Sequence, residues 1–319
     1  MLYPGLLRWT ASGLRLEDAL IIAGSNRSGT TWLQEVLAEL PGSVTSFEPL
    51  HVDVIPAARA AGFHKLSWFD PCAEHPLAER YLRNVLSGRE WSGYSAQFNT
   101  LSNCLRPRQL VVKFIHANGI LDWMTGHLPV RRPLVVVRHP AAVNSSVLNK
   151  QWNLSDLQQT LLRSELVQGS PELTCYIGHL KTPIEQLTAR WCLENAILFK
   201  STSPRKFDLV TYESLVLGGP AALMDLFKNW NLAAPESVAT AHARDSFMSA
   251  SNRSYNSAAQ RLSKWRSEIT ESQLAQILKI CRDFGLDFYS EESAPDELLF
   301  RNCTASGLLD TQKFAARAA

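Results

Sequence analysis

The sequence predicts an α/β fold: a parallel β-sheet of the P-loop-like kind, flanked by helices on both faces. Apolar runs at 19–23, 110–116 and 133–137 are nearly continuous, which is typical of strands that are buried on both sides. Segments with helical character separate these runs, and a glycine-bearing turn follows the first of them. With 319 residues and 45% hydrophobic content, the chain is expected to form one domain over 1–319.

The first half of the chain supplies the opening strand and helix. We expect a strand at 19–23 and a helix at 30–40 that stops at Pro41 and Gly42. A short extended piece at 44–51, broken by Pro49, follows the helix. The mixed pattern of about 51–105 is interpreted as an insertion of helices and loops that walls a binding pocket.

The second half repeats the alternation of strand and helix. Strands are predicted at 110–116, 133–137 and 207–211, and a second, polar insertion, with the character of a lid, at about 150–190. Helices are predicted at about 141–148, 221–230 and 271–284, and Gly285 ends the last of them.

Composition excludes several classes of function. The net charge is +2, so no global field marks a nucleic-acid binder. No stretch approaches the ~20 apolar residues of a membrane span, and we therefore expect a soluble, cytoplasmic protein without a membrane partner. The six cysteines are far apart and lack metal-ligand spacing, so reduced thiols are expected rather than disulfides or a metal site.

The turn after the first apolar run has the features of a phosphate-binding loop. Gly24 and Gly29 have the spacing of the G-x-x-x-x-G-K-[ST] loop, in which backbone amides and a helix N-terminus surround an anion. Thr30 stands where that loop has its lysine, and the nearby cation is Arg27. The loop is therefore expected to hold one 5′-phosphate, and the ligand is predicted to be a nucleotide other than ATP.

Further polar residues follow the other predicted strands, at the sheet edge where open parallel sheets bind ligands. His116, Arg138 and Tyr212 all stand at such strand ends. Ser146 lies about two helical turns beyond Arg138, so the pair is suited to a second phosphate, as in a 3′,5′-bisphosphate. Arg138 also stands where ATP-hydrolysing proteins place an acidic Mg²⁺ ligand, so no metal is expected.

Two motifs together resemble those of the PAPS-dependent sulfotransferases, where PAPS is 3′-phosphoadenosine 5′-phosphosulfate. Residues 27–32 resemble the 5′-phosphosulfate loop of that family, and residues 135–146 resemble its 3′-phosphate site. Weaker likeness continues at 212–215 and 262–265. Features of the cytosolic, carbohydrate and tyrosyl branches are mixed: Arg27 resembles the Golgi and bacterial members, whereas Trp32 resembles the cytosolic branch.

The resemblance implies a sulfotransferase fold and a set of cofactor-binding residues. In that reading Trp32 stacks on adenine, and Arg27 stabilises the leaving group. The implied cofactor contacts are Arg27, Ser28, Gly29, Thr30, Thr31, Trp32, Arg138, Ser146, Tyr212 and Lys264.

Two residues compete for the role of general base. Glu48 stands twenty-one residues after Arg27, which resembles the catalytic glutamate of tyrosyl sulfotransferases, and His116 precedes Arg138 by twenty-two, which resembles the histidine of the cytosolic branch. The plain alternatives are an exposed turn carboxylate for Glu48 and a core histidine bonded to backbone for His116. Glu48 is favoured. Lys113, inside an apolar strand, is expected to reach the site or to face out at an edge, without a part in catalysis.

The implied reaction is in-line transfer of a sulfuryl group from PAPS, with release of 3′,5′-ADP. The expected acceptor is a hydroxyl, or an amine, of a small-molecule natural product or a glycan. Two other classes stay open: a nucleotide kinase or NTPase with a degenerate P-loop, and a non-catalytic nucleotide-binding protein. The residues name neither the acceptor nor the oligomeric state.

Overall fold

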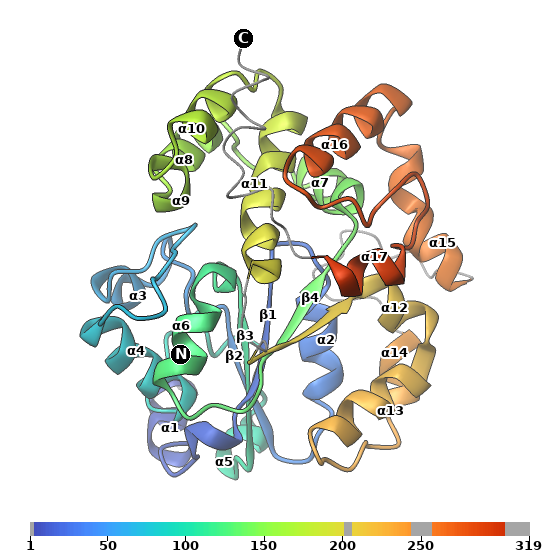
Figure 1. The fold of residues 1–319 in the computed structure, drawn as a ribbon. Helices are drawn as coiled ribbons and strands as arrows, with labels where there is room; N and C mark the ends of the chain where they lie inside the picture. Colours follow the sequence, from blue (N-terminus) through green and yellow to red (C-terminus); the bar gives the residue numbers. More distant parts are fainter. Residues whose placement is uncertain (1–2, 201–205, 244–256, 304–319) are drawn as a thin grey trace.

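The computed structural model of the protein describes residues 3–200, 206–243 and 257–303. Its centre is a five-stranded sheet in which all neighbouring strands are parallel, in the order β2-β3-β1-β4-β5 (Figure 1). The strands are β1 (Leu20–Gly24), β2 (Ser43–Phe47), β3 (Gln109–Phe114), β4 (Leu134–Val137) and β5 (Asp208–Thr211). Helices lie on both sides of the sheet, so the predicted α/β class is confirmed.

Alternate strand residues serve two separate hydrophobic cores. Leu20, Ile22 and Val136 pack against α2 and α12–α15 on one face. Ile21, Val112 and Val135 belong to a larger core on the other face, which the remaining helices cover. Both faces are therefore buried, which explains why these strands read as continuous apolar runs.

Of the helices before β4, α2 packs in the smaller core, and those with buried apolar side chains among the others pack in the larger one. The helices before β4 are α1 (Tyr3–Thr10), η1 (Leu16–Asp18), α2 (Thr30–Leu37), α3 (Pro56–Ala60), α4 (Pro76–Leu86), α5 (Leu101–Leu105), η2 (Asn118–Ile120) and α6 (Leu121–His127). Helix α2 begins at the predicted residue but ends at Leu37, three residues before the predicted end. Beyond it the amides of Glu39 and Leu40 bond to carbonyls three residues earlier, which is a turn geometry and not an α-helical one.

The helices after β4 complete both layers. They are α7 (Pro140–Leu148), α8 (Leu157–Leu162), α9 (Glu165–Gln168), α10 (Pro171–Gly178), α11 (Pro183–Phe199), α12 (Tyr212–Leu217), α13 (Gly219–Asn229), α14 (Val238–Ala243), α15 (Ala258–Ser263), η3 (Lys264–Ser267), α16 (Glu271–Asp283) and α17 (Glu297–Asn302).

The first half of the extended piece predicted at 44–51 forms the edge strand of the sheet. Strand β2 pairs with β3 from Ser43 to Phe47, and the Glu48 amide donates to the Lys113 carbonyl at 2.9 Å. The chain leaves the sheet only there. This register places Glu48 beside the carboxyl end of β3, at the edge of the sheet where the other predicted site residues gather.

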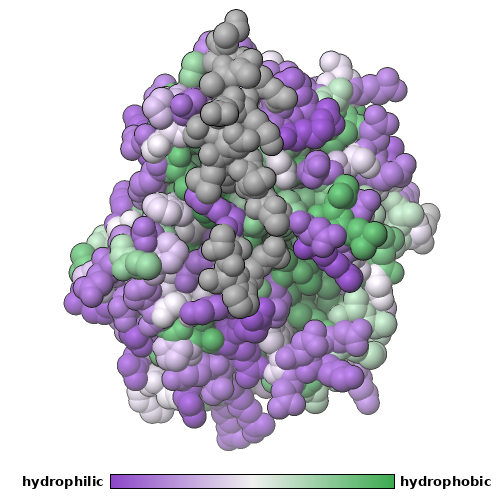
Figure 2. Space-filling view, viewed as in Figure 1, coloured by the Kyte–Doolittle hydropathy of each residue, from purple (hydrophilic) through white to green (hydrophobic). Residues whose placement is uncertain are grey.

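The surface in Figure 2 is largely hydrophilic, with hydrophobic side chains in smaller groups between. Within the described ranges, no helix has the length and apolar character needed to cross a bilayer. All six cysteines lie in the described part of the chain and are free thiols, of which four are buried.

Candidate functional site

The turn between β1 and α2 is shaped by two glycines. A Cβ on Gly24 would lie 2.6 Å from the Val136 carbonyl oxygen, so only glycine allows β1 and β4 to approach this closely. Gly29 has φ +92° and caps α2 without a side chain. The amides of the first helical turn therefore stay directed at the space above the turn, as an anion site requires.

Arg27, Arg138 and Ser146 converge on this turn. The Arg27 Nε donates to the Ser146 hydroxyl at 2.8 Å, and the Arg138 Nη1 donates to the Arg27 carbonyl at 3.0 Å. Burial, and then the charge of Arg138, lower the pKa of Arg27. Two guanidinium groups held together at the end of a sheet favour an anion between or beside them.

Aromatic rings line the wall behind these arginines. The Arg138 guanidinium lies 4.5 Å from the centroid of the Tyr212 ring, which also packs on Gly29. Trp32 meets Tyr212 edge-on at 5.6 Å, and the Arg261 guanidinium lies 5.0 Å above the Trp32 ring. Arg261 precedes Lys264 by three residues and faces the cavity, a role that the sequence motif assigned to Lys264.

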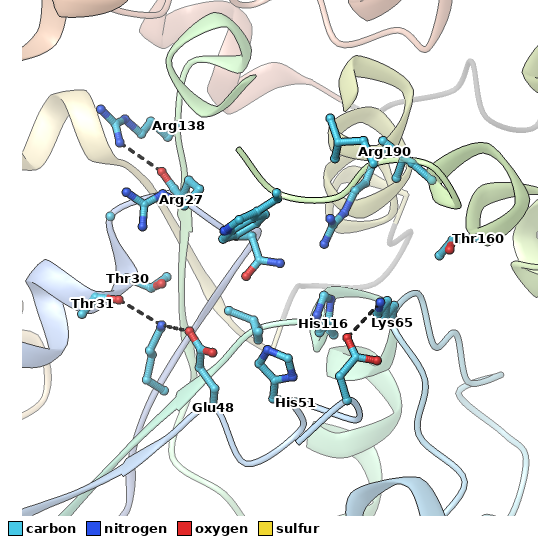
Figure 3. A pocket seen from close by; sticks show the side chains of 18 of the residues that line it. Arg27, Thr30, Thr31, Glu48, His51, Lys65, His116, Arg138, Thr160 and Arg190 are labelled. Atoms are coloured by element: carbon cyan, nitrogen blue, oxygen red, sulfur yellow. Dashed lines mark hydrogen bonds and ion pairs between the residues drawn. The ribbon is translucent and has the colours of Figure 1, made fainter. Parts of the chain in front are cut away.

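Arg27, Arg138 and the groups behind them open onto one cavity of about 500 Å³ at the carboxyl ends of the strands (Figure 3). We call its two parts the loop half and the far half. The loop half is lined by Arg27, Thr30, Thr31, Trp32, Arg138, Tyr212 and Arg261. The far half is lined by His51, Asp53, Lys65, His116, Trp152, Asn153, Leu154, Asp156, Leu157, Thr160 and Arg190. Both segments predicted as insertions thus contribute to the cavity wall.

Glu48 lies between the two halves and is held by a buried ion pair. Lys113 donates to one carboxylate oxygen of Glu48 and, at 3.0 Å, to the Thr31 hydroxyl of the loop. The Tyr94 hydroxyl donates to Oε2 of Glu48 at 2.7 Å. Burial and the Glu48 charge raise the pKa of Tyr94, so this phenol stays a donor.

These contacts decide two of the sequence-based alternatives. Glu48 is 8% exposed, so the exposed turn carboxylate is wrong. Lys113 is 2% exposed and reaches the site end of the sheet rather than solvent at an edge. Burial lowers the Lys113 pKa, and the Glu48 carboxylate opposes that effect. Sequence reasoning undervalued this lysine, which joins Thr31 to the candidate base.

His116 also lines the cavity, as a neutral side chain. Burial, followed by the charge of Arg190, lowers the pKa of His116 well below its usual range. Its ring bonds the Lys65 backbone, and Nδ1 lies 3.9 Å from a Glu194 carboxylate oxygen. His116 is therefore buried and bonded to backbone, as the core-histidine alternative expects, but its ring also lines the cavity.

Backbone strain gathers at the three candidate catalytic residues. Arg27, Glu48 and His116 have φ values of 69°, 46° and 63°, in the left-handed region that side chains other than glycine rarely adopt. Such conformations cost of order 1–3 kcal/mol each and tend to occur where function requires them. Each of the three lies at or just beyond the end of a strand, and each lines the cavity.

Buried polar atoms without a hydrogen-bond partner also collect around this cavity. Among the residues that the structure describes, such atoms in the loop half are Trp32 Nε1 and Arg138 Nε. In the far half they are His51 Nδ1, His116 Nδ1 and Arg190 Nη2. An unsatisfied buried polar group costs about 1–3 kcal/mol, so both halves are prepared for polar ligand groups.

Three predicted contacts, Ser28, Ser146 and Lys264, lie outside the cavity lining. Ser28 is buried and its hydroxyl donates to the Ser25 carbonyl, so it shapes the turn. Lys264 lies 3.7 Å from the Glu268 carboxylate, which also accepts from Ser145 of α7. Ser146 meets the site through Arg27. Within the described ranges, no group of three or more His, Cys, Asp or Glu side chains is arranged to hold a metal.

Sequence reasoning missed several residues that line the cavity, among them Arg190 and Arg261. Arg190 and Glu194 lie four residues apart in the otherwise largely apolar stretch of α11, a pattern that signals a buried ion pair. Arg261 lies next to the 262–265 motif and was passed over in favour of Lys264.

No protein-family profile and no curated protein matches the chain. Among solved structures it is similar to the "Sulfotransferase Domain from the Curacin Biosynthetic Pathway", with 18% identity, a TM-score of 0.47, and coverage of 84% of this chain and 98% of that one. It is also similar to the "Sulfotransferase Domain from the Synechococcus PCC 7002 Olefin Synthase", with 16% identity, a TM-score of 0.45, and coverage of 86% and 95%.

Proposed function

We propose that this protein is a sulfotransferase that moves a sulfuryl group from PAPS to a hydroxyl, or an amine, of a small molecule or glycan. The observation that carries the proposal is the meeting of Arg27, Arg138 and Ser146 at a glycine turn that lacks the P-loop lysine. A loop and a second basic group at neighbouring strand ends suit a nucleotide with two separate phosphates. The cytoplasmic location stays a prediction.

The loop half fits the donor chemically. Phosphate oxygens accept from guanidinium groups, and the unpartnered Arg138 Nε has that capacity. Arg261, which lies over the buried Trp32 ring and lines the cavity, offers a planar cationic surface to a purine base. We infer that Arg27 and the turn hold the 5′ end and that Arg138 holds the 3′-phosphate.

PAPS supplies an activated sulfuryl group and leaves as 3′,5′-ADP. In the proposed reaction the acceptor oxygen forms a bond to sulfur while its proton passes to Glu48. The bond from sulfur to the bridging phosphate oxygen breaks, and its electron pair stays on that oxygen. Arg27, the turn amides and the Thr30 and Thr31 hydroxyls are suited to stabilise this charge.

Glu48 is favoured as the base because of its contacts. It lies between the two halves, and Lys113 links it to Thr31 of the loop. A carboxylate has about four lone-pair positions, so the bonds from Lys113 and Tyr94 leave room for an acceptor hydroxyl. His116, neutral and with an unpartnered Nδ1, is the alternative base.

Calorimetry with three nucleotides tests the assignment. We expect the protein to bind 3′,5′-ADP more tightly than adenosine 5′-phosphate and more tightly than ATP with Mg²⁺. Replacing Arg138 by lysine should remove most of the preference for 3′,5′-ADP over the 5′-monophosphate. Preference for ATP with Mg²⁺ would instead favour a kinase or NTPase. Binding of 3′,5′-ADP without transfer from ³⁵S-labelled PAPS to any acceptor would favour a non-catalytic protein.

A further inference from the structure

The far half of the cavity contains a guanidinium group whose hydrogen-bonding capacity is only partly used. Arg190, on α11, has a side chain that is 15% exposed, and its Nε donates to the Glu194 carboxylate at 3.0 Å. Its Nη2 is buried and has no hydrogen-bond partner among the described residues. Arginine carries five N–H donors, so one ion pair leaves a donor-rich face toward the cavity. Figure 3 shows this side chain extending into the cavity, across from His116 and Lys65.

Arg190 is paired with Glu194, so its capacity for an anion rests on the unpartnered Nη2 rather than on an unpaired charge. Asp53, the nearest acidic group to Lys65, lies 2.9 Å from the lysine Nζ, so these two charges compensate each other. Burial first, and then the Arg190 charge, keep the pKa of His116 low, so its ring adds no positive charge. Asp156 lies exposed at the start of α8, on the outer wall. The Glu48 charge is compensated by Lys113.

We propose that the acceptor carries an anionic group, a carboxylate or a comparable oxyanion, which Arg190 binds in the far half while the acceptor hydroxyl lies at Glu48. This inference rests on the proposed function, because it assigns the loop half to the nucleotide. An oxyanion would satisfy the buried Nη2 and form the charge-assisted hydrogen bonds for which a planar guanidinium is suited. The Lys65 ammonium and the Thr160 hydroxyl also line the far half and are further donors to it.

The size of the cavity limits the acceptor. Ligand pockets commonly measure ~300–1,000 Å³, and the volume of about 500 Å³ has to hold both the nucleotide and the acceptor. An acceptor that shares this volume with a nucleotide has to be small, and a small hydroxy acid meets that limit. Its neutral amide lacks the charge and offers only one carbonyl oxygen, so it should bind much less tightly.

The test compares acids with their own amides on the nucleotide-loaded protein. Wild-type protein saturated with 3′,5′-ADP is titrated in a calorimeter with 3-hydroxypropanoate, 6-hydroxyhexanoate and 4-hydroxyphenylacetate, and with the amide of each. We expect at least one acid to bind about tenfold to a hundredfold more tightly than its amide, as the loss of a hydrogen bond to a charged group implies.

Two variants assign the preference to Arg190 without leaving Glu194 as an unpaired buried charge. Arg190→Lys keeps the charge but loses the planar fork, and the double variant Arg190→Met, Glu194→Gln removes both charges. Both should lose most of the acid preference and keep 3′,5′-ADP affinity within about twofold. The matched control Arg163→Ala, an exposed arginine at the end of α8 outside the lining, should keep both properties.

The outcomes separate this inference from the proposed function. Wild-type protein that binds 3′,5′-ADP but no acid better than its amide overturns the inference alone. The same holds if the double variant keeps the acid preference, or if the acids displace 3′,5′-ADP and thus occupy the loop half. Wild-type protein that fails to bind 3′,5′-ADP overturns the proposed function, and this inference with it.

Discussion

At the scale of single residues, Arg27 and Arg138 are expected to act at different stages. Arg27→Ala should lower turnover by about 10²–10³, the usual effect of losing one preorganised donor to a developing charge. Arg138→Ala should mainly raise the PAPS concentration needed, because its proposed phosphate is not the leaving one. Steady-state kinetics with varied PAPS separate the two effects, and near-wild-type turnover of Arg27→Ala would remove its leaving-group role.

The base is a second question at this scale, and the contacts of Glu48 and His116 predict different outcomes. Glu48→Gln keeps the shape of the side chain and the Tyr94 contact but cannot accept the proton. We expect it to lower the single-turnover rate by roughly 10²–10⁴. His116→Ala should change the rate less, because the far half holds it next to Arg190. If only the histidine variant abolishes the chemical step, His116 is the base.

At the scale of elements, the turn between β1 and α2 depends on Gly29. Its φ of +92° disfavours a side chain, and a Cβ there would lie 2.3 Å from the Tyr212 ring that supports Arg138. Gly29→Ala should therefore displace Tyr212 and weaken 3′,5′-ADP binding at least about tenfold, as the loss of one hydrogen bond to a charged group would. Gly126→Ala, in α6 with open space around its Cβ position, is the matched control and should bind normally. Equal affinity of the two variants would contradict this role of the turn.

Helix α7, which carries Ser146, begins at a buried histidine that links the fold to pH. His139 Nδ1 accepts from the Ala141 amide at 3.1 Å, and Nε2 donates to the Ser290 carbonyl at 3.0 Å, so both contacts require the neutral ring. Burial lowers its pKa to about 4, against 6.5 in the unfolded chain. The unfolded state therefore binds more protons between these values, and stability falls as pH drops through that window.

The corresponding measurement compares unfolding by urea at pH 7 and pH 5. For His139 alone, the two pKa values imply a loss of about 2 kcal/mol between these pH values. His139→Asn keeps a capping side chain but does not titrate, so its loss should be smaller by about that amount, although its stability at pH 7 is lower. An unchanged pH dependence in this variant would assign the acid sensitivity to other groups, among them His116.

The elements differ in how far their residues could reveal them. Strands β1, β3 and β4 were predicted within a residue or two because their apolar runs are buried on both faces. Helix α11 was missed, since thirteen of its seventeen residues are buried and its pattern has no polar face to mark a period. Lys113 was undervalued for a related reason. The role of a charged side chain inside an apolar strand depends on its contacts, and its partners Thr31, in α2, and Glu48, after β2, are distant in the sequence.

At the scale of the whole molecule, the cavity joins segments that are distant in the sequence. The turn after β1, the end of β2, the segment before α8, helix α11 and Arg261 of α15 all line it. The loop half was predictable because it lies in two short motifs at strand ends. In the far half His116 was predicted, at a strand end, but Lys65, Thr160 and Arg190 were not, because they meet only when the two long insertions fold over the sheet.

A ligand that contacts several of these segments should stabilise the whole fold by linkage. At a free concentration one hundred times its dissociation constant, 3′,5′-ADP should add about 2.7 kcal/mol to the unfolding free energy. ATP with Mg²⁺ at the same concentration should add less, because Thr30 replaces the P-loop lysine and Arg138 would repel the metal. EDTA should change neither the stabilisation by 3′,5′-ADP nor transfer from PAPS. Thermal unfolding with each ligand measures this, and a larger effect of ATP that EDTA abolishes would contradict the proposed donor.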